Sequence, residues 1–315
     1  MYKGVTIIMS HGLQNFRNVL ISVACIAVLC NPALQAADSL PPLADVHLHY
    51  NGDQEGVVSP KEAIAILKLQ NVKLAVVSST PPELALALRK AGGSWVIPLF
   101  RPYFSERQRY RWFADPTVLT RARKALASGD YKGIGELHLI AGLGPSRKNK
   151  ILHGLIRLAI EFNVPLLIHI ETSSERYFTP LCDQYPKARF LIAHAGGLLN
   201  AMQMHNMFKA CINVWTEFSA RDHMRYQHSP IVNNKGQLLE DWRKLINQYP
   251  DRFMIGSDPF WPVEKEIAME EPDSGWLYVN DYLNFHRKWL AGLPEKTRRK
   301  LEYDNAVKFF ANSDK

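Results

Sequence analysis

The chain has 315 residues, of which 47% are hydrophobic, and this length is enough for one large domain with a substantial core. Its formal net charge of +8 is moderately basic and spread along the sequence, so it could favour anionic substrates or a negatively charged surface, but it mostly reflects a solvated exterior. No second composition regime or low-complexity linker interrupts the sequence, which argues against a chain of dissimilar domains.

The first segment, residues 1–36, is predicted to be a secretory signal peptide. Lys3 and Arg17 lie in a leading region without acidic residues, residues 19–30 form an apolar stretch, and a small-residue site follows at 34–36. The apolar stretch is too short to span a bilayer comfortably, which argues against a permanent anchor. We therefore expect cleavage at that site and a periplasmic or secreted protein.

Removal of this segment leaves residues 37–315 as a single predicted domain, with a formal charge of +6 because two basic residues and no acidic one are lost. The alternatives are an uncleaved anchor or a lipid attached to Cys25 or Cys30. Only Cys182 and Cys211 remain after cleavage. A disulfide between them is compatible with export, but a domain of this size does not need one, so we expect two buried thiols.

The predicted domain alternates strand-like and helix-like segments. The strand-like runs are apolar along nearly their whole length, which indicates burial on both faces, as in a parallel sheet covered by helices. They lie at residues 43–50, 72–80, 95–103, 131–139, 164–171, 188–196, 212–220 and 252–260. Helical spacing occurs at 60–69, 82–90, 116–126, 151–162 and 238–248. This alternation favours an α/β fold of the closed (β/α)₈ TIM barrel type, with an open doubly wound sheet as the alternative.

Polar residues interrupt these apolar runs near their carboxyl ends. His47 and His49 are two positions apart, so in an extended strand both side chains point to the same face and can approach one ion. The fourth, fifth, sixth and eighth runs carry Glu136, His169, His194 and Asp258 in equivalent positions. Catalytic groups of this type of barrel project from the carboxyl ends of its strands. Any one of these residues could be a satisfied core residue, but six at the same end indicate a site.

The sequence resembles the amidohydrolase superfamily of metal-dependent hydrolases, in particular its amidohydrolase-related (amidohydrolase 2) branch. The resemblance is carried by DVHLH, GIGELH, LLIHIE, LIAHAG and IGSDPF, which occur in the superfamily's order. It extends from about Ala44 to a terminal helix that contains Asn305 and Ala306. It implies a divalent metal centre and a small-molecule substrate.

The resemblance also implies a role for each residue of the set. His47, His49 and Asp258 would hold one divalent ion, while His169 and His194 would hold a second ion or assist the first. Glu136 stands where many binuclear members have a lysine modified to a bridging carbamate, and a minority of members use glutamate there. One or two ions per chain are therefore expected. Imidazole and carboxylate ligands suit zinc, our first expectation, and also manganese, iron or nickel.

The chemistry follows from the ligand types. A bound metal ion provides hydroxide near neutral pH and polarises the carbonyl or phosphoryl oxygen that is attacked. Asp258 would take up a proton and deliver it to the leaving group, and His194 is predicted to act beside it in catalysis. His138 lies on the same strand face as Glu136, and Glu171 on the same face as His169. Both could therefore orient ligands or substrate, or could pack inside the barrel.

The segment Arg101–Phe113 follows the third strand and is expected to lie over the same face of the barrel. It interleaves four arginines with aromatic residues, which could neutralise and stack on an anionic aromatic or acid substrate. It could instead pack on the barrel rim as a solvated loop, or bind single-stranded nucleic acid, which export makes the weakest alternative. Arg101 and Trp261 are the predicted substrate-binding residues, the second in a long loop that could form a lid or pocket wall.

Together these features predict an exported metal-dependent hydrolase, without a nucleic-acid partner or a stable membrane anchor. Two alternatives remain open. One is a metal-dependent non-oxidative decarboxylase of the same superfamily, because members with a similar site break carbon–carbon bonds. The other is a metal-binding protein without turnover, against which Asp258 argues, because a pure binding site does not need a general base.

Overall fold

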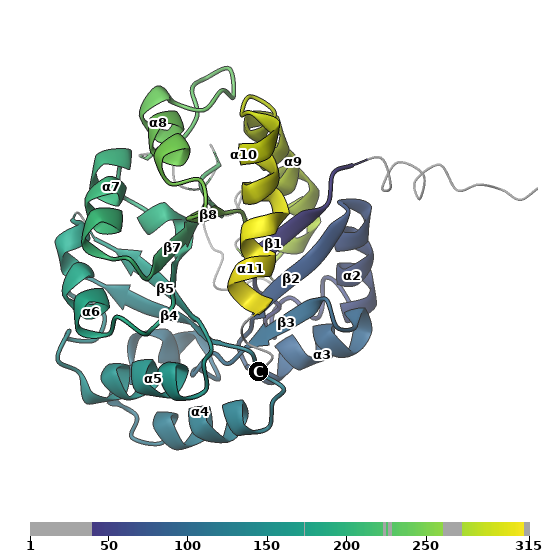
Figure 1. Ribbon diagram of the computed structural model, residues 1–315. Coiled ribbons are helices and arrows are strands. Elements are labelled where there is room, and N and C mark those ends of the chain that lie inside the picture. The colour runs from purple at the N-terminus through teal and green to yellow at the C-terminus, as the bar shows by residue number, and fades with distance from the viewer. Residues whose placement is uncertain (1–39, 173, 223–224, 226–228, 261–272, 312–315) are drawn as a thin grey trace, which may run out of the picture.

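The computed structural model describes residues 40–172, 174–222, 225, 229–260 and 273–311 (Figure 1). The predicted signal peptide lies outside the described residues. Within them, strands and helices alternate along the chain, and the helices lie around the outside of the strands. Among the described helices, none has the combination of length and apolar character that crossing a bilayer requires.

All the strand pairs are parallel, as the near-continuous apolar runs predict. The strands are β1 (Leu43–Leu48), β2 (Val72–Ser78), β3 (Val96–Leu99), β4 (Ile134–Ile140), β5 (Leu166–Glu171), β6 (Phe190–Ile192), β7 (Val214–Glu217) and β8 (Phe253–Met254). They pair in chain order as β1-β2-β3 and as β4-β5-β6-β7-β8. Each strand falls inside its predicted run except β4, which extends one residue beyond it, to Ile140. Strands β6 and β8 are shorter than predicted, because they end before the polar residues of their runs.

Two sets of backbone hydrogen bonds join these groups of strands into a ring. Between β3 and β4, the Phe100 amide donates to the Gly133 carbonyl at 2.9 Å, and a parallel bridge links Phe100 to Ile134. Between β8 and β1, the Val46 amide donates to the Ile255 carbonyl at 3.0 Å, and the Asp258 amide to the His47 carbonyl at 2.7 Å. The closed (β/α)₈ barrel is therefore confirmed, and the open sheet is wrong.

Three of the helices that follow strands begin at a residue whose side chain accepts from free backbone amides. Ser59 and Glu62 form a capping box at the first helix, Asn149 caps α5, and Asn200 with Gln203 forms a second capping box at α7. The helices are α2 (Pro60–Leu69), α3 (Glu83–Gly92), α4 (Val118–Ala127), α5 (Lys150–Glu161), α6 (Thr179–Gln184), α7 (Ala201–Ala210), α8 (Glu240–Gln248), α9 (Val279–Leu290), α10 (Glu295–Arg299) and α11 (Asn305–Ala311). The five predicted helical segments agree with α2 to α5 and α8 within two residues at each end.

The interior of the barrel is apolar at the end where the strands begin. Ala44, Val46, Leu167 and Met254 belong to a buried cluster that α11 completes with Phe309 and Phe310. Helix α11 lies across the centre of the ring of strands (Figure 1). Because this end is filled by apolar side chains, the polar groups gather at the opposite, carboxyl end of the strands.

The two cysteines of the domain form a disulfide, so the expectation of two free thiols was wrong. Cys182 lies in α6 and Cys211 directly follows α7, and their Cα atoms are 5.7 Å apart across 29 residues of sequence. That separation suits a disulfide. The size of the domain indicated only that a crosslink is not needed for stability. The disulfide forms because consecutive helices around a barrel lie side by side, which places the two cysteines next to each other.

Helix α9 supports the end of β8 through a buried neutral histidine. His286 donates from Nε2 to the Gly256 carbonyl at 3.0 Å and accepts from Trp289 Nε1 at 3.2 Å, so both ring nitrogens are used in the uncharged form. Burial lowers the pKa of His286 from 6.5 to about 4. In the unfolded chain the pKa returns to its ordinary value, so the unfolded state binds the proton more tightly.

This histidine should make the fold less stable in mild acid. Its contribution is fully present above pH 6.5 and is lost as the pH falls toward 4, with a slope of up to about 1.4 kcal/mol per pH unit in the free energy of unfolding. We expect His286→Gln to flatten the dependence in this window. Urea unfolding of both proteins at several pH values measures the difference, and equal slopes would contradict the prediction.

Candidate metal centre

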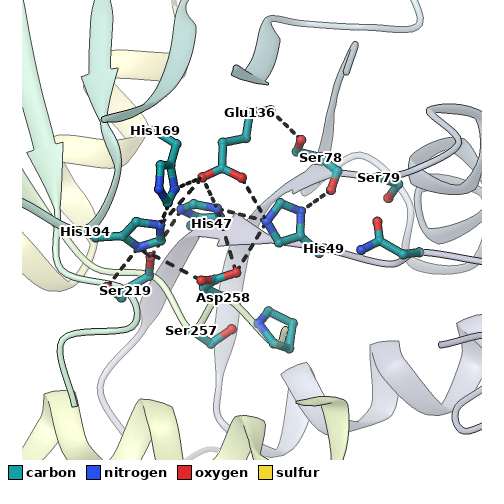
Figure 2. A network of polar contacts seen from close by, with 12 residues as sticks. His47, His49, Ser78, Ser79, Glu136, His169, His194, Ser219, Ser257 and Asp258 are labelled. Carbon is teal, nitrogen blue, oxygen red and sulfur yellow. Dashed lines mark hydrogen bonds and ion pairs between the residues drawn. The ribbon is translucent and has the colours of Figure 1, made fainter. Parts of the chain in front are cut away.

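The six residues predicted from the strand ends lie together at the carboxyl end of the barrel (Figure 2). Each is at most 9% exposed. They come from β1 and the residue after it, β4, β5, the turn after β6 and the segment after β8, so no short stretch of sequence contains the site. The residues are His47, His49, Glu136, His169, His194 and Asp258.

A first group of ligand atoms comes from β1 and the segment after β8. His47 Nε2 and His49 Nε2 are 3.1 Å apart, and His49 Nε2 is 3.3 Å from Asp258 Oδ1. The third side of this triangle, from His47 Nε2 to Asp258 Oδ1, measures 3.9 Å. Gly256 permits the arrangement, because a Cβ atom there would lie 2.7 Å from His47 Cβ.

A second group comes from β4, β5 and the turn after β6. Glu136 Oε1 is 3.0 Å from His169 Nδ1 and 3.6 Å from His194 Nε2, and the two imidazole nitrogens are 3.2 Å apart. The Glu136 carboxylate also faces the first group, with Oε2 at 3.3 Å from His49 Nε2 and Oε1 at 3.6 Å from His47 Nε2. Figure 2 shows this carboxylate between the histidines of both groups.

The hydrogen bonds of the histidines fit a bound cation. His49 Nδ1 must donate to the Ser78 carbonyl at 2.5 Å, and His47 Nδ1 lies 2.9 Å from a carboxylate oxygen of Glu217. In the neutral rings both Nε2 atoms therefore carry lone pairs, which face each other and the Asp258 carboxylate. Asp258 Oδ1 has no hydrogen-bond partner among the described residues. Such an arrangement of acceptors is what a metal ion requires.

The electrostatics agree with this geometry. Burial lowers the pKa of His47, but the Glu136, Asp258 and Glu217 carboxylates outweigh that effect and raise it well above its ordinary value. The excess of negative charge thus favours a cation at this position. Burial and the Arg101 guanidinium instead lower the pKa of His49, which keeps that ring neutral and able to bind a metal ion.

The sequence matches a known family over most of its length. The model of the amidohydrolase family (Amidohydro_2) matches residues 90–311, more than half of the chain. The protein belongs to the amidohydrolase family. It is a metal-dependent hydrolase that acts on a small molecule.

Solved structures share the barrel of this amidohydrolase at low sequence identity. A protein of Agrobacterium tumefaciens, solved without ligand, has 14% identity and a TM-score of 0.56 over 86% of this chain and 97% of its own. A TatD homologue of Escherichia coli has 12% identity and a TM-score of 0.57 over 85% and 98%. The phosphotriesterase homology protein of Escherichia coli, solved with phosphate in its active site, has 12% identity and a TM-score of 0.53 over 85% and 98%. A comparison with curated protein sequences finds no match.

A pocket of about 460 Å³ opens over the metal-centre residues of the amidohydrolase. Its wall includes Arg101, Arg109, Tyr110, Arg225 and Phe260. The Arg109 guanidinium lies 5.3 Å from the centre of the Phe260 ring. The pocket therefore combines cationic and aromatic surface close to the candidate ligands. The predicted pocket residue Trp261 lies outside the described residues.

Arg101 reaches the pocket from beneath its surface. Its side chain is 2% exposed, with Nη1 donating to Thr80 Oγ1 at 3.0 Å and Nη2 to Glu136 Oε2 at 3.3 Å. The rest of the segment Arg101–Phe113 combines two of its predicted roles, packing on the barrel and lining the substrate pocket. Tyr103 and Trp112 are buried against the barrel, whereas Arg109 and Tyr110 line the pocket.

Further side chains around the centre contribute packing and hydrogen bonds. Trp276, in the short helix Gly275–Tyr278, is fully buried and donates from Nε1 to the His49 carbonyl at 2.9 Å. His138 stacks on His169 with ring centres 4.4 Å apart. Because the hydroxyl of Tyr103 donates to the Glu136 carbonyl, it can only accept from His138 Nδ1, which leaves His138 Nε2 as an acceptor at the pocket wall.

Glu217 is a residue of the centre that the sequence did not predict. It ends β7, is fully buried and lies 2.9 Å from His47 Nδ1. The sequence feature that could have identified Glu217 is the one that identified Glu136, a carboxylate near the carboxyl end of an apolar run. The superfamily motifs that guided the choice of residues include none from the seventh strand, so the signal in INVWTEFSA was passed over.

Proposed function

We propose that this amidohydrolase is an exported enzyme that hydrolyses a small anionic substrate at a carbonyl or phosphoryl centre. The observation that carries the proposal is the pair of ligand groups, which share the Glu136 carboxylate at the base of a pocket. His47, His49 and Asp258 would hold one divalent ion, and His169 and His194 a second. Zinc suits these nitrogen and oxygen donors, with manganese, iron or nickel as alternatives.

The protein's own groups would divide the work of the reaction. A bound divalent ion supplies Lewis acidity and lowers the pKa of water to near neutrality. Asp258 would accept a proton at its carboxylate and pass it to the leaving group, with His194 beside it. His194 Nδ1 lies 4.0 Å from Asp258 Oδ2, which is ion-pair distance and longer than a hydrogen bond.

The charge of the pocket wall supports an anionic substrate. Arg101, Arg109 and Arg225 line the pocket, and the guanidinium of Arg109 lies over the aromatic ring of Phe260. A carboxylate or phosphate could approach these guanidinium groups while an apolar part of the substrate contacts the ring.

Export is supported by the leader-like sequence and by the disulfide. The acid-free basic region and apolar stretch before residue 37 are typical of a signal peptide, and disulfides persist in oxidising compartments. Protein expressed with its own leader should begin near residue 37 and occur in the periplasm or medium. An intact Met1 on protein confined to the cytoplasm would contradict this part of the proposal.

The activity is tested by elemental analysis of the purified protein, followed by a panel of esters, lactones, amides and phosphoesters. Metal in the protein together with release of acid from an anionic member of the panel is the expected result. Release of carbon dioxide from an aromatic acid would identify a decarboxylase instead. If fully metal-loaded protein turned over none of the substrates, the alternative of a metal-binding protein without turnover would be favoured.

A further inference from the structure

The Glu217 carboxylate accepts hydrogen bonds from one histidine of each ligand group. Its Oε1 accepts from His47 Nδ1 at 2.9 Å and from the backbone amide of His194 at 2.9 Å. The same oxygen accepts from the Ser219 hydroxyl at 3.0 Å, and Oε2 accepts from the Ser219 amide. Four donors therefore converge on a carboxylate that is fully buried at the end of β7.

These hydrogen bonds argue that Glu217 orients ligands and is not itself a ligand. Its position near His47 and His194 would allow it to contribute an oxygen to an ion. Both of its oxygens, however, already accept from nitrogen or hydroxyl donors, two of them backbone amides that cannot turn away. A buried carboxylate that accepts the second N–H of a metal-binding histidine is the usual device for fixing that ring.

Glu217 acts on the two histidines in different ways, through the ring of His47 and through the backbone of His194. In the neutral ring, acceptance from His47 Nδ1 leaves Nε2 unprotonated and facing His49 and Asp258. On the other side, His194 has a φ of 57°, a left-handed conformation that is unfavourable for a residue with a side chain. Its amide is anchored by Glu217, and its Nδ1 lies 2.9 Å from the Ser219 hydroxyl.

We propose that Glu217 is a positioning residue that sets one histidine of each ligand group, the ring of His47 and the backbone of His194. This inference rests on the proposed metal centre. It adds that the affinities of the two ion positions are linked through one carboxylate on β7, with Ser219 as the second contact to both histidines.

The test is metal binding by Glu217→Gln, without any substrate. Zinc affinity is measured on metal-free protein by competition with a chromophoric chelator, and the visible spectrum of the cobalt-loaded protein reports ligand geometry. We expect the affinity to fall by about 10- to 100-fold at both positions, with the parent number of ions still bound at saturation. The cobalt spectrum should change, and Glu217→Asp should recover part of the affinity because it keeps the charge.

A matched control comes from the same strand. Thr216 is fully buried and donates to the Ile192 carbonyl at 2.7 Å, so Thr216→Val removes a hydrogen bond from β7 without touching a histidine of the centre. It should lower stability while zinc affinity stays at the parent value. Ser219→Ala, which leaves the carboxylate in place, should weaken zinc binding severalfold and serves if Glu217→Gln does not fold.

The other outcomes overturn the inference in distinguishable ways. Loss of one whole equivalent of metal at saturation in Glu217→Gln would make Glu217 a ligand. Parent-like affinity and cobalt spectrum, with only a lower melting temperature, would make its role purely structural. Parent protein that binds no divalent ion would refute the proposed metal centre itself.

Discussion

Asp258→Asn is expected to lower turnover per folded, metal-loaded chain by about a hundredfold or more, the usual contribution of a positioned general base. Asp258 faces His49 across 3.3 Å and lines the pocket. Burial alone would raise the pKa of its carboxyl, but the His47, His49 and His194 imidazoles and the Arg225 guanidinium lower it. The carboxylate is therefore ionised at neutral pH, and asparagine keeps its shape while removing the charge and the proton acceptor.

The measurement separates catalysis from metal binding and from folding. Rates on the substrate that the hydrolytic panel identifies are divided by the amount of folded protein that holds metal. At least one ion should remain, because the four histidines of the centre are unchanged. Asp273→Asn is a matched control, since Asp273 is a buried carboxylate, 3% exposed, that accepts from the Gly275 amide and is not one of the six candidate residues. Near-equal rates for parent and Asp258→Asn would remove Asp258 from the mechanism.

The barrel could be predicted from the sequence because its strands are buried on both faces. Runs such as residues 164–171 are apolar almost throughout, and only a parallel sheet covered by helices explains that pattern repeatedly. The sequence favoured closure through the number of strand–helix units but could not exclude the open sheet, because the bonds from Phe100 to Gly133 and from Val46 to Ile255 are made by backbone groups, which carry no sequence signal. The disulfide was missed for a similar reason, since only the packing of α6 beside α7 brings the two cysteines together.

The residues of the centre could be chosen because a histidine or carboxylate at the end of an apolar strand is conspicuous. The distances between them come from the curvature of the barrel, which places β1 next to β8 and so brings Asp258 to His49. Their roles as ligands stay a prediction that metal analysis must test. Glu217 shows the limit of choosing by motif, because its strand end carries the same signal as β4 but supports two ligands without matching any of the motifs used.

Glu136→Gln is expected to lower the metal content from about two ions per chain toward one. Glu136 is the carboxylate that both ligand groups share, with Oε1 facing His169 and Oε2 facing His49. Burial raises the pKa of its carboxyl, but the surrounding imidazoles, His138 and His47 first among them, lower it well below its ordinary value, so it is ionised. The amide of glutamine loses this charge and offers one oxygen in place of two, so it cannot bridge two cations.

A second carboxylate of the same pocket supplies the matched control for this change. Glu171 also lines the pocket, and its Oε2 lies 3.8 Å from His169 Nε2, but it does not stand between the two ligand groups. Glu171→Gln should therefore keep the parent metal content, whereas Glu136→Gln should lose about half of it when both are reconstituted with excess zinc and analysed for metal per chain. Parent protein that never exceeds one ion under these conditions would show that Glu136 is not a bridge. In that case His169 and His194 would assist a single ion held by His47, His49 and Asp258.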